Sequence, residues 1–145
     1  MSARKYHRLI YLLSVAQRRV QRAVGANSAE AVSPAQAGLL FVLGKQDGVL
    51  MGEAGAALDL GAAGISGLVD RMAAADLVER RADEKDARAW RVFLTPQGRK
   101  SLVRAGEIAR EMNARLAQGF SEDEIDIVAR WLTSIPSKFP KGDGE

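Results

Sequence analysis

The sequence contains no cysteine, and His7 is its one histidine. Without cysteine the chain cannot form disulfides, thiolate metal sites or a cysteine oxidation switch. One histidine also leaves a single chain short of ligands for a zinc site of the usual histidine–cysteine type. We therefore expect neither a metal site nor a cofactor.

Long apolar runs are also missing, since no stretch approaches the roughly 18 residues that a membrane-spanning helix needs. The hydrophobic residues near the N-terminus are interrupted by Arg8, Arg18 and Arg19, unlike those of a signal peptide. We expect a cytoplasmic protein with no membrane association.

Catalytic motifs are absent as well. There is no H-E-x-x-H pair and no phosphate-cradling glycine motif, and His7 belongs to no recognisable triad. The glycines of Gly61-Ala62-Ala63-Gly64 open a helical pattern and do not follow a strand. We expect no catalytic residue and no enzyme.

What is present is an ordinary globular composition: 145 residues, 47% hydrophobic, with a net charge of +3. This length suits one domain with a real core. The small positive charge permits nucleic-acid binding without establishing it. Its distribution says more, because basic residues gather in residues 1–22 and 80–100, whereas residues 46–75 carry an excess of acid.

Periodic apolar residues predict helices at both ends of the chain. A spacing of three and four residues predicts a helix over about 4–26. Ser33-Pro34-Ala35-Gln36 has the pattern of a capping box with proline in the first turn, and opens a second helix that Asp47-Gly48 ends.

The C-terminal part shows the same kind of signal. Thr95-Pro96 opens a helix with a heptad-like apolar repeat, which Gly119 ends. Ser121-Glu122-Asp123-Glu124 is a second capping box, and the helix that it opens should close at Pro136.

The middle of the chain has the outline of a winged helix-turn-helix. Glu53–Asp59 is predicted to be a short helix, Gly61 breaks it, and a further helix follows over about Ala62–Ala75. Leu77–Arg80 and Trp90–Leu94 have strand character and are separated by a polar, charged loop. A hairpin directly after a helix-turn-helix is a wing.

Three strings within this region resemble the MarR family of bacterial transcription regulators. They are Leu68–Met72 followed by Asp76–Arg80, the D-x-x-D-x-R pattern of Asp83–Arg88, and the L-T-P-x-G turn of Leu94–Arg99. Their order and spacing make the match fairly specific, and the helical pattern extends it to about Met1–Pro136.

The resemblance implies a mainly α (α+β) fold: a winged helix-turn-helix with about six helices, a two-stranded wing and a two-fold homodimer. Residues 1–138 would be a single regulator domain, with residues 33–95 binding double-stranded DNA and residues 4–26 and 96–136 forming the dimer. Residues 139–145 would be a loose tail. The dimer would act as a repressor on a near-palindromic operator with half-sites about 34 Å apart. A small aromatic or lipophilic acid would release it.

By this resemblance, the helix over Ala62–Ala75 enters the major groove. Its exposed start has little chemistry for base reading, because Ser66 is its only polar residue. The family usually has threonine, serine and arginine there. Contact would then come from methyl groups or from close backbone approach, or the helix would be only structural. The candidate DNA-binding residues of this segment are Ala62, Ala63, Gly64, Ser66 and Gly67.

Three basic residues complete the candidate interface. Arg88 at the wing tip suits a narrow minor groove, or it is simply solvated. We expect Asp86 to orient Arg88, and Lys85 to contact a phosphate. Arg71 either binds a phosphate or pairs with Asp70 or a neighbouring helix.

The aromatic residues have two interpretations. Tyr6, His7 and Tyr11 could line a ligand pocket near the dimer region or belong to an aromatic interface stripe. Trp90 and Trp131 are expected to be packing residues. The poor side-chain set at the start of the helix over Ala62–Ala75 also keeps open a second function, a winged-helix protein-interaction module that has lost DNA reading.

Overall fold

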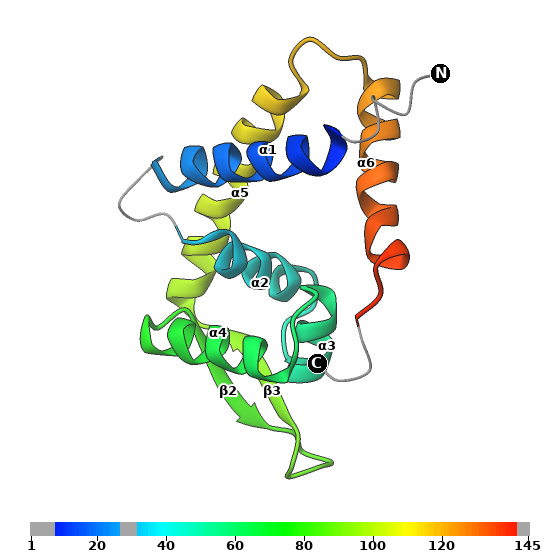
Figure 1. Cartoon of the computed structure of the whole chain (residues 1–145). Helices are drawn as coiled ribbons and strands as arrows, with labels where there is room; N and C mark the ends of the chain where they lie inside the picture. Colours follow the sequence, from blue (N-terminus) through cyan, green and yellow to red (C-terminus); the bar gives the residue numbers. More distant parts are fainter. Residues whose placement is uncertain (1–7, 27–31, 142–145) are drawn as a thin grey trace. The chain divides into compact units, whose positions relative to one another are not determined.

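The computed structural model describes residues 8–26 and 32–141, and the chain forms two compact units, Met1–Ile108 and Ala109–Glu145. The chain is mainly helical, as expected, and Figure 1 shows the winged helix within the first unit. The elements in order are α1 (Arg8–Ala26), α2 (Pro34–Lys45), β1 (Val49–Leu50), α3 (Met51–Ala57), α4 (Ala62–Ala74), β2 (Val78–Ala82), β3 (Trp90–Leu94), α5 (Pro96–Ala117) and α6 (Glu122–Lys138).

The wing is the predicted hairpin of β2 and β3, but β1 adds a third strand, so the antiparallel sheet has the order β1-β3-β2. Val49 of β1 pairs with Val92 of β3. A strand of two residues has no measurable periodicity, which is why the sequence predicted two strands only. In the hairpin, Val78 lies opposite Leu94 and Ala82 lies opposite Trp90.

Helix α2 begins as its sequence predicts. The Ser33 hydroxyl accepts from the Gln36 N–H at 3.3 Å, and the Gln36 side chain accepts from the Ser33 N–H at 3.0 Å. Beyond the helix, Gly48 has a φ of 77°, and an added Cβ would lie 2.6 Å from the Phe93 ring. The turn into β1 therefore requires glycine.

The core of the first unit lies between α2, α4 and the sheet. Its fully buried large side chains are leucines of α2, three residues of α4 and Val92 of β3, each of which contributes roughly 1.5–3 kcal/mol by its burial. Because Leu68, Val69 and Met72 are buried, the opposite side of α4 is held toward solvent. The fully buried large side chains are Leu39, Leu40, Leu43, Leu68, Val69, Met72 and Val92.

The bounds of two helices, α3 and α6, differ from the sequence-based prediction. Helix α3 occupies Met51–Ala57, slightly earlier than the expected Glu53–Asp59. Helix α6 does not close at Pro136 but continues to Lys138. The proline lacks an N–H for its own bond, yet the Phe139 N–H still donates to the Ile135 carbonyl at 3.1 Å, so the last turn closes beyond it.

The second unit contains the end of α5 and all of α6. Gly119, with a φ of 86°, lies in the turn between them, and Ser121 and Glu124 form the predicted capping box at the start of α6. Among the described residues, no helix is both long enough and apolar enough to cross a membrane.

Candidate nucleic-acid interface

The start of α4 is open to solvent. Ala62, Ala63 and Gly64 are exposed, the N-cap residue Gly61 supplies no side-chain acceptor, and the first turn holds no acidic residue. The N-cap side chain therefore satisfies none of the first N–H groups of the helix, and no acidic side chain of the first turn offsets the positive end of its dipole. Such a helix end can approach a phosphate or a base edge with its backbone.

One turn later, α4 brings together Gly67 and Arg71. A Cβ at Gly67 would lie 3.3 Å from Nη1 of Arg71, so the guanidinium lies back along the helix over the glycine. Arg71 is exposed, while Ser66 and Gly67 are half-buried. The Arg71 charge is therefore presented on the solvent side of α4.

Asp70 pairs with an arginine of the wing strand. Its carboxylate accepts from Nη2 of Arg80, and the same nitrogen donates to the Ser66 carbonyl at 3.1 Å. The sequence left open a pairing of Arg71 with Asp70, but the partner observed for Asp70 is Arg80. The sequence placed Arg80 in a strand but gave it no role, because the contact depends on how β2 packs against α4.

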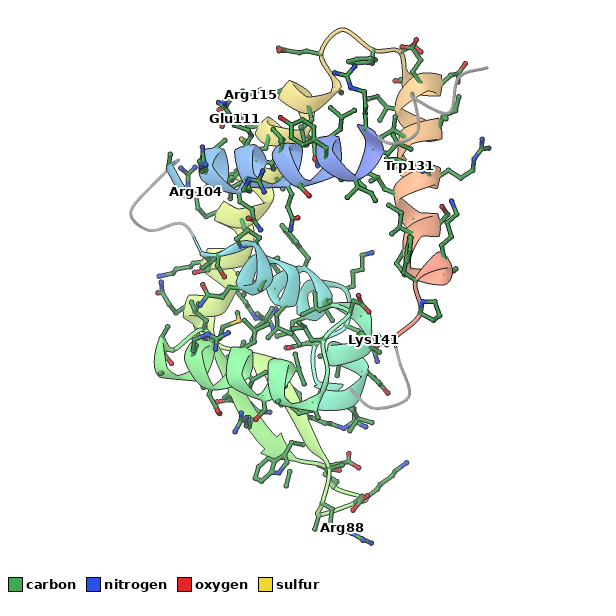
Figure 2. The ribbon with its side chains drawn as sticks, viewed as in Figure 1. Arg88, Arg104, Glu111, Arg115, Trp131 and Lys141 are labelled. Carbon is green, nitrogen blue, oxygen red and sulfur yellow. The ribbon has the colours of Figure 1, made fainter. Side chains whose placement is uncertain are left out.

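The wing tip carries Arg88, whose side chain is 97% exposed and points away from the sheet (Figure 2). The Asp86 carboxylate accepts from the Arg88 N–H at 3.0 Å and lies 3.8 Å from its Nε. Asp86 therefore shapes the loop around Arg88 while the guanidinium remains in solvent. Lys85 is exposed in the same loop.

The base of the wing is fixed by a partly buried ion pair. Nε of Arg91 donates to Asp83 at 2.7 Å, and Nη1 of Arg91 donates to the Gly48 carbonyl at 2.8 Å. The Arg91 hydrogen bond holds the pKa of Asp83 below its ordinary value, and the same bond raises the pKa of Arg91. The sequence showed Asp83 as part of the wing motif, but it did not show that Arg91 is the partner of Asp83.

A second clamp joins the turn after α2 to the end of the wing. Asp47 accepts from the Leu94 N–H at 2.8 Å with one carboxylate oxygen and pairs with Arg99 at 3.0 Å with the other. The sequence predicted Asp47 only as a helix stop. Together the two clamps hold β3 against the body of the winged helix.

Of the three candidate ligand-binding residues, Tyr11 alone lies among the described residues. Tyr11 lies on α1 with 65% of its surface exposed, whereas Tyr6 and His7 lie outside the described residues. Trp90 was expected to pack but is 48% exposed. The described part of the chain contains no group of histidine, cysteine and acidic residues that could hold a metal ion.

Comparison with known proteins identifies a family whose members share this winged helix. A model of the MarR family matches residues 32–89, which include α2, the helix-turn-helix and most of the wing. No curated protein matches the chain. The resemblance to the MarR family is thus confirmed, and the chain has the fold of a MarR-family transcriptional regulator.

Solved structures extend the likeness to nearly the whole chain. A probable transcriptional regulator from Pseudomonas aeruginosa is 27% identical, with a TM-score of 0.81 over 88% of this chain and 96% of the other. The transcriptional repressor CouR, bound to a 23-mer DNA duplex, is 26% identical, with a TM-score of 0.81 over 92% and 95%.

A third structure concerns a regulator that responds to a ligand. The protein is BpsR from Bordetella bronchiseptica, whose DNA binding is regulated by 6-hydroxynicotinic acid. BpsR is 22% identical, with a TM-score of 0.76 over 88% of this chain and 98% of the other. At this identity the likeness is one of fold.

Proposed function

We propose that the protein is a cytoplasmic, DNA-binding transcriptional regulator, not an enzyme, and that it acts as a homodimeric repressor. The observation that carries the proposal is the pairing of two features on one winged helix. These features are a reading helix with an open N-terminus and a wing that presents a fully solvated arginine. The DNA-bound repressor CouR, which shares the fold, supports this assignment.

Within this function, α4 enters a major groove and Arg88 enters the adjacent minor groove, where a narrow groove concentrates negative potential. Lys85 and Arg71 contact phosphates. The backbone at Gly64 and Gly67 approaches the DNA closely, Ser66 donates a hydrogen bond, and the methyl groups of Ala62 and Ala63 contact thymine. Affinity then comes mainly from charge, and specificity mainly from the shape of the operator.

Exposed apolar side chains on the terminal helices support a homodimer. Ile10 and Tyr11 of α1 are 79% and 65% exposed, and large hydrophobic residues of the second unit are also exposed. Such surface is costly in a monomer and is typical of an interface. Those of the second unit are Leu116, Phe120, Ile127, Val128, Leu132 and Phe139.

In the proposed dimer, residues 33–95 bind DNA and residues 4–26 and 96–136 form the interface, within one regulator domain of residues 1–138. The two-fold axis places the half-sites of a near-palindromic operator about 34 Å apart. A small aromatic or lipophilic acid releases the DNA, and the regulation of BpsR by 6-hydroxynicotinic acid supports an effector of this kind. Tyr6, His7 and Tyr11 are the candidates to contact the acid.

The test is a fluorescence anisotropy titration with DNA from the region upstream of the protein's own gene, against a shuffled duplex of equal composition, at 50–200 mM salt. We expect the upstream DNA to bind at least tenfold more tightly than the shuffled DNA, and both affinities to fall steeply with salt. Equal affinity for the two duplexes at every salt concentration would contradict the proposal.

The second candidate is a winged-helix module that binds a protein. The alanines and glycines at the start of α4 favour it, because they offer no bidentate contact to a base. The same titration separates the two functions, since a protein-binding module would show no salt-dependent preference for any duplex.

A further inference from the structure

The wing contains an aromatic side chain that the proposed contacts leave unused. Trp90 is the first residue of β3, and 48% of its surface is exposed. Side chains alternate along a strand, so Trp90 shares a face with Val92 and Leu94, which are 0% and 7% exposed. Trp90 thus continues the buried face of the sheet beyond the edge of the core.

The neighbours of Trp90 leave about half of its surface exposed. Its partner across the hairpin is Ala82, whose side chain is too small to shield an indole ring. Within residues 8–26 and 32–141, the indole N–H has no hydrogen-bond partner. The side chain therefore offers solvent a flat apolar surface with a free donor.

Contacts of β2 show toward which element the Trp90 face of the sheet points. Leu77, just before β2, donates to the Met72 carbonyl, and Arg80 reaches the Ser66 carbonyl, so the strand runs back along α4 toward its N-terminus. A strand advances about 3.3 Å per residue, so the Ala82–Trp90 pair lies about 6–7 Å beyond Arg80 along β2. Trp90 therefore lies on the α4 side of the wing, past Ser66 in the direction of the exposed start of α4.

The charges of the hairpin strands on this face do not oppose a polyanion. Arg80 is the one charged residue that the two hairpin strands place on it, since Glu79, Arg81 and Arg91 point to the other face. The nearby Asp70 carboxylate is already bound by Arg80. A negatively charged partner can therefore approach the indole without meeting an unpaired carboxylate of the strands.

We propose that Trp90 is a DNA-contact residue, with its ring against the deoxyribose of the backbone between the two grooves and its indole N–H donating to a phosphate. The inference rests on the proposed function and adds a contact to it. Aromatic side chains with a polar edge suit this task, because they bury a large area and keep one directed hydrogen bond. The contact supplies area that the alanines and glycines of α4 lack.

The chain has two tryptophans, which makes the contact observable. Trp131→Phe leaves Trp90 as the sole indole, and Trp90→Phe leaves Trp131, which lies on α6 in the second unit (Figure 2). Each variant is titrated with the upstream DNA while the intrinsic fluorescence and its quenching by acrylamide are followed. We expect the DNA to change the emission of Trp90 and to lower its quenching constant at least twofold, with no change for Trp131.

Affinity provides the second readout. We expect Trp90→Ala to weaken binding of the upstream DNA about tenfold and Trp90→Phe about threefold, because phenylalanine keeps the ring but not the donor. The melting temperature of each variant shows whether it folds. Unaltered quenching of Trp90 at saturating DNA, or unchanged affinity of a folded Trp90→Ala variant, would overturn the inference while the proposed function stands.

Two other outcomes also count against it. Protection of Trp90 that depends on protein concentration without DNA would assign the indole to a contact between copies of the chain. If the unmodified protein prefers no duplex over any other, the proposed function and this inference fail together.

Discussion

The reading helix and the wing of this winged helix differ sharply in chemistry. Helix α4 opens with Ala62, Ala63 and Gly64 and presents backbone groups, whereas the wing presents Lys85 and the solvated Arg88. Backbone and methyl contacts discriminate weakly between bases, while exposed cations give strong but salt-dependent affinity. For the proposed function, the contrast predicts that affinity for DNA resides mainly in the wing and that α4 contributes little base reading.

The largest expected effect comes from the wing tip. Arg88→Ala should weaken binding of the upstream DNA about 10- to 100-fold, because a groove contact of arginine is worth about 1–3 kcal/mol. The slope of log affinity against log salt should fall by about 0.9, the effect of one lost cation. Anisotropy titrations at several salt concentrations measure both quantities.

Lys138→Ala, near the end of α6, removes an equal charge far along the chain from the wing and serves as the control. It should leave the affinity within about twofold. If Arg88→Ala behaves like this control, affinity does not reside in the wing tip and the comparison between wing and helix loses its basis.

The next effect tests the tie between the two regions. Arg80 joins β2 to Asp70 and to the Ser66 carbonyl of α4, and its side chain is 32% exposed. Arg80→Ala should lower the free energy of unfolding by about 1 kcal/mol and weaken DNA binding several-fold, because helix and wing lose their fixed relation. Chemical denaturation and anisotropy measure the two effects.

Asp70→Asn is the matched variant, since it weakens the ion pair but leaves the bond to the Ser66 carbonyl available. It should therefore give a smaller loss of affinity than Arg80→Ala. Equal DNA affinity of the unmodified protein, Arg80→Ala and Asp70→Asn would show that the orientation of the wing does not depend on the contact of Arg80 with α4.

A smaller effect should separate stability from binding at the helix itself. A Cβ at Gly64 would meet the Leu60 side chain at 3.5 Å, an ordinary contact. Gly64→Ala should therefore stabilise the protein by about 0.5–1 kcal/mol, because alanine is the better helix former. The added methyl should nevertheless weaken DNA binding about threefold, since it separates backbone from phosphate. Unchanged or tighter binding would indicate that α4 lies further from the DNA than proposed.

The features that these variants change differ in how well the sequence alone predicts them. The capping box at Ser33, the strand Trp90–Leu94 and the apolar stripe of α4 were predictable, because each depends on local chemistry or periodicity. The motif Asp83–Arg88 identified the wing. What could not be predicted are contacts across elements, since they depend on how packed helices and strands bring distant residues together.

The pairing of Arg80 with Asp70 and Ser66 illustrates this limit. Asp70 offered its sequence neighbour Arg71 as a partner, yet that side chain lies over Gly67 instead. The exposure of Trp90 is a second case, because its apolar pattern fits a buried strand and only the position of the core edge leaves it in solvent.

The smallest expected effect concerns the base of the wing and its response to acid. Arg91 holds the pKa of Asp83 below the ordinary aspartate value, so the pair stabilises the folded protein fully at a pH above that ordinary value. Its contribution should disappear as the pH falls from there through the lowered pKa of the folded state, because Asp83 is then protonated. At neutral pH the pair is unaffected, so DNA binding near pH 7 should not depend on this titration.

Asp83→Asn tests this reasoning, because asparagine keeps the shape of the side chain and removes the titrating group. The variant should be slightly less stable than the unmodified protein at pH 7, and the difference should shrink as the pH falls below the ordinary aspartate value. Urea denaturation at a series of pH values measures it. A stability difference that stays constant into this acid range would mean that the wing base is held by the bond from Arg91 to the Gly48 carbonyl and not by the ion pair.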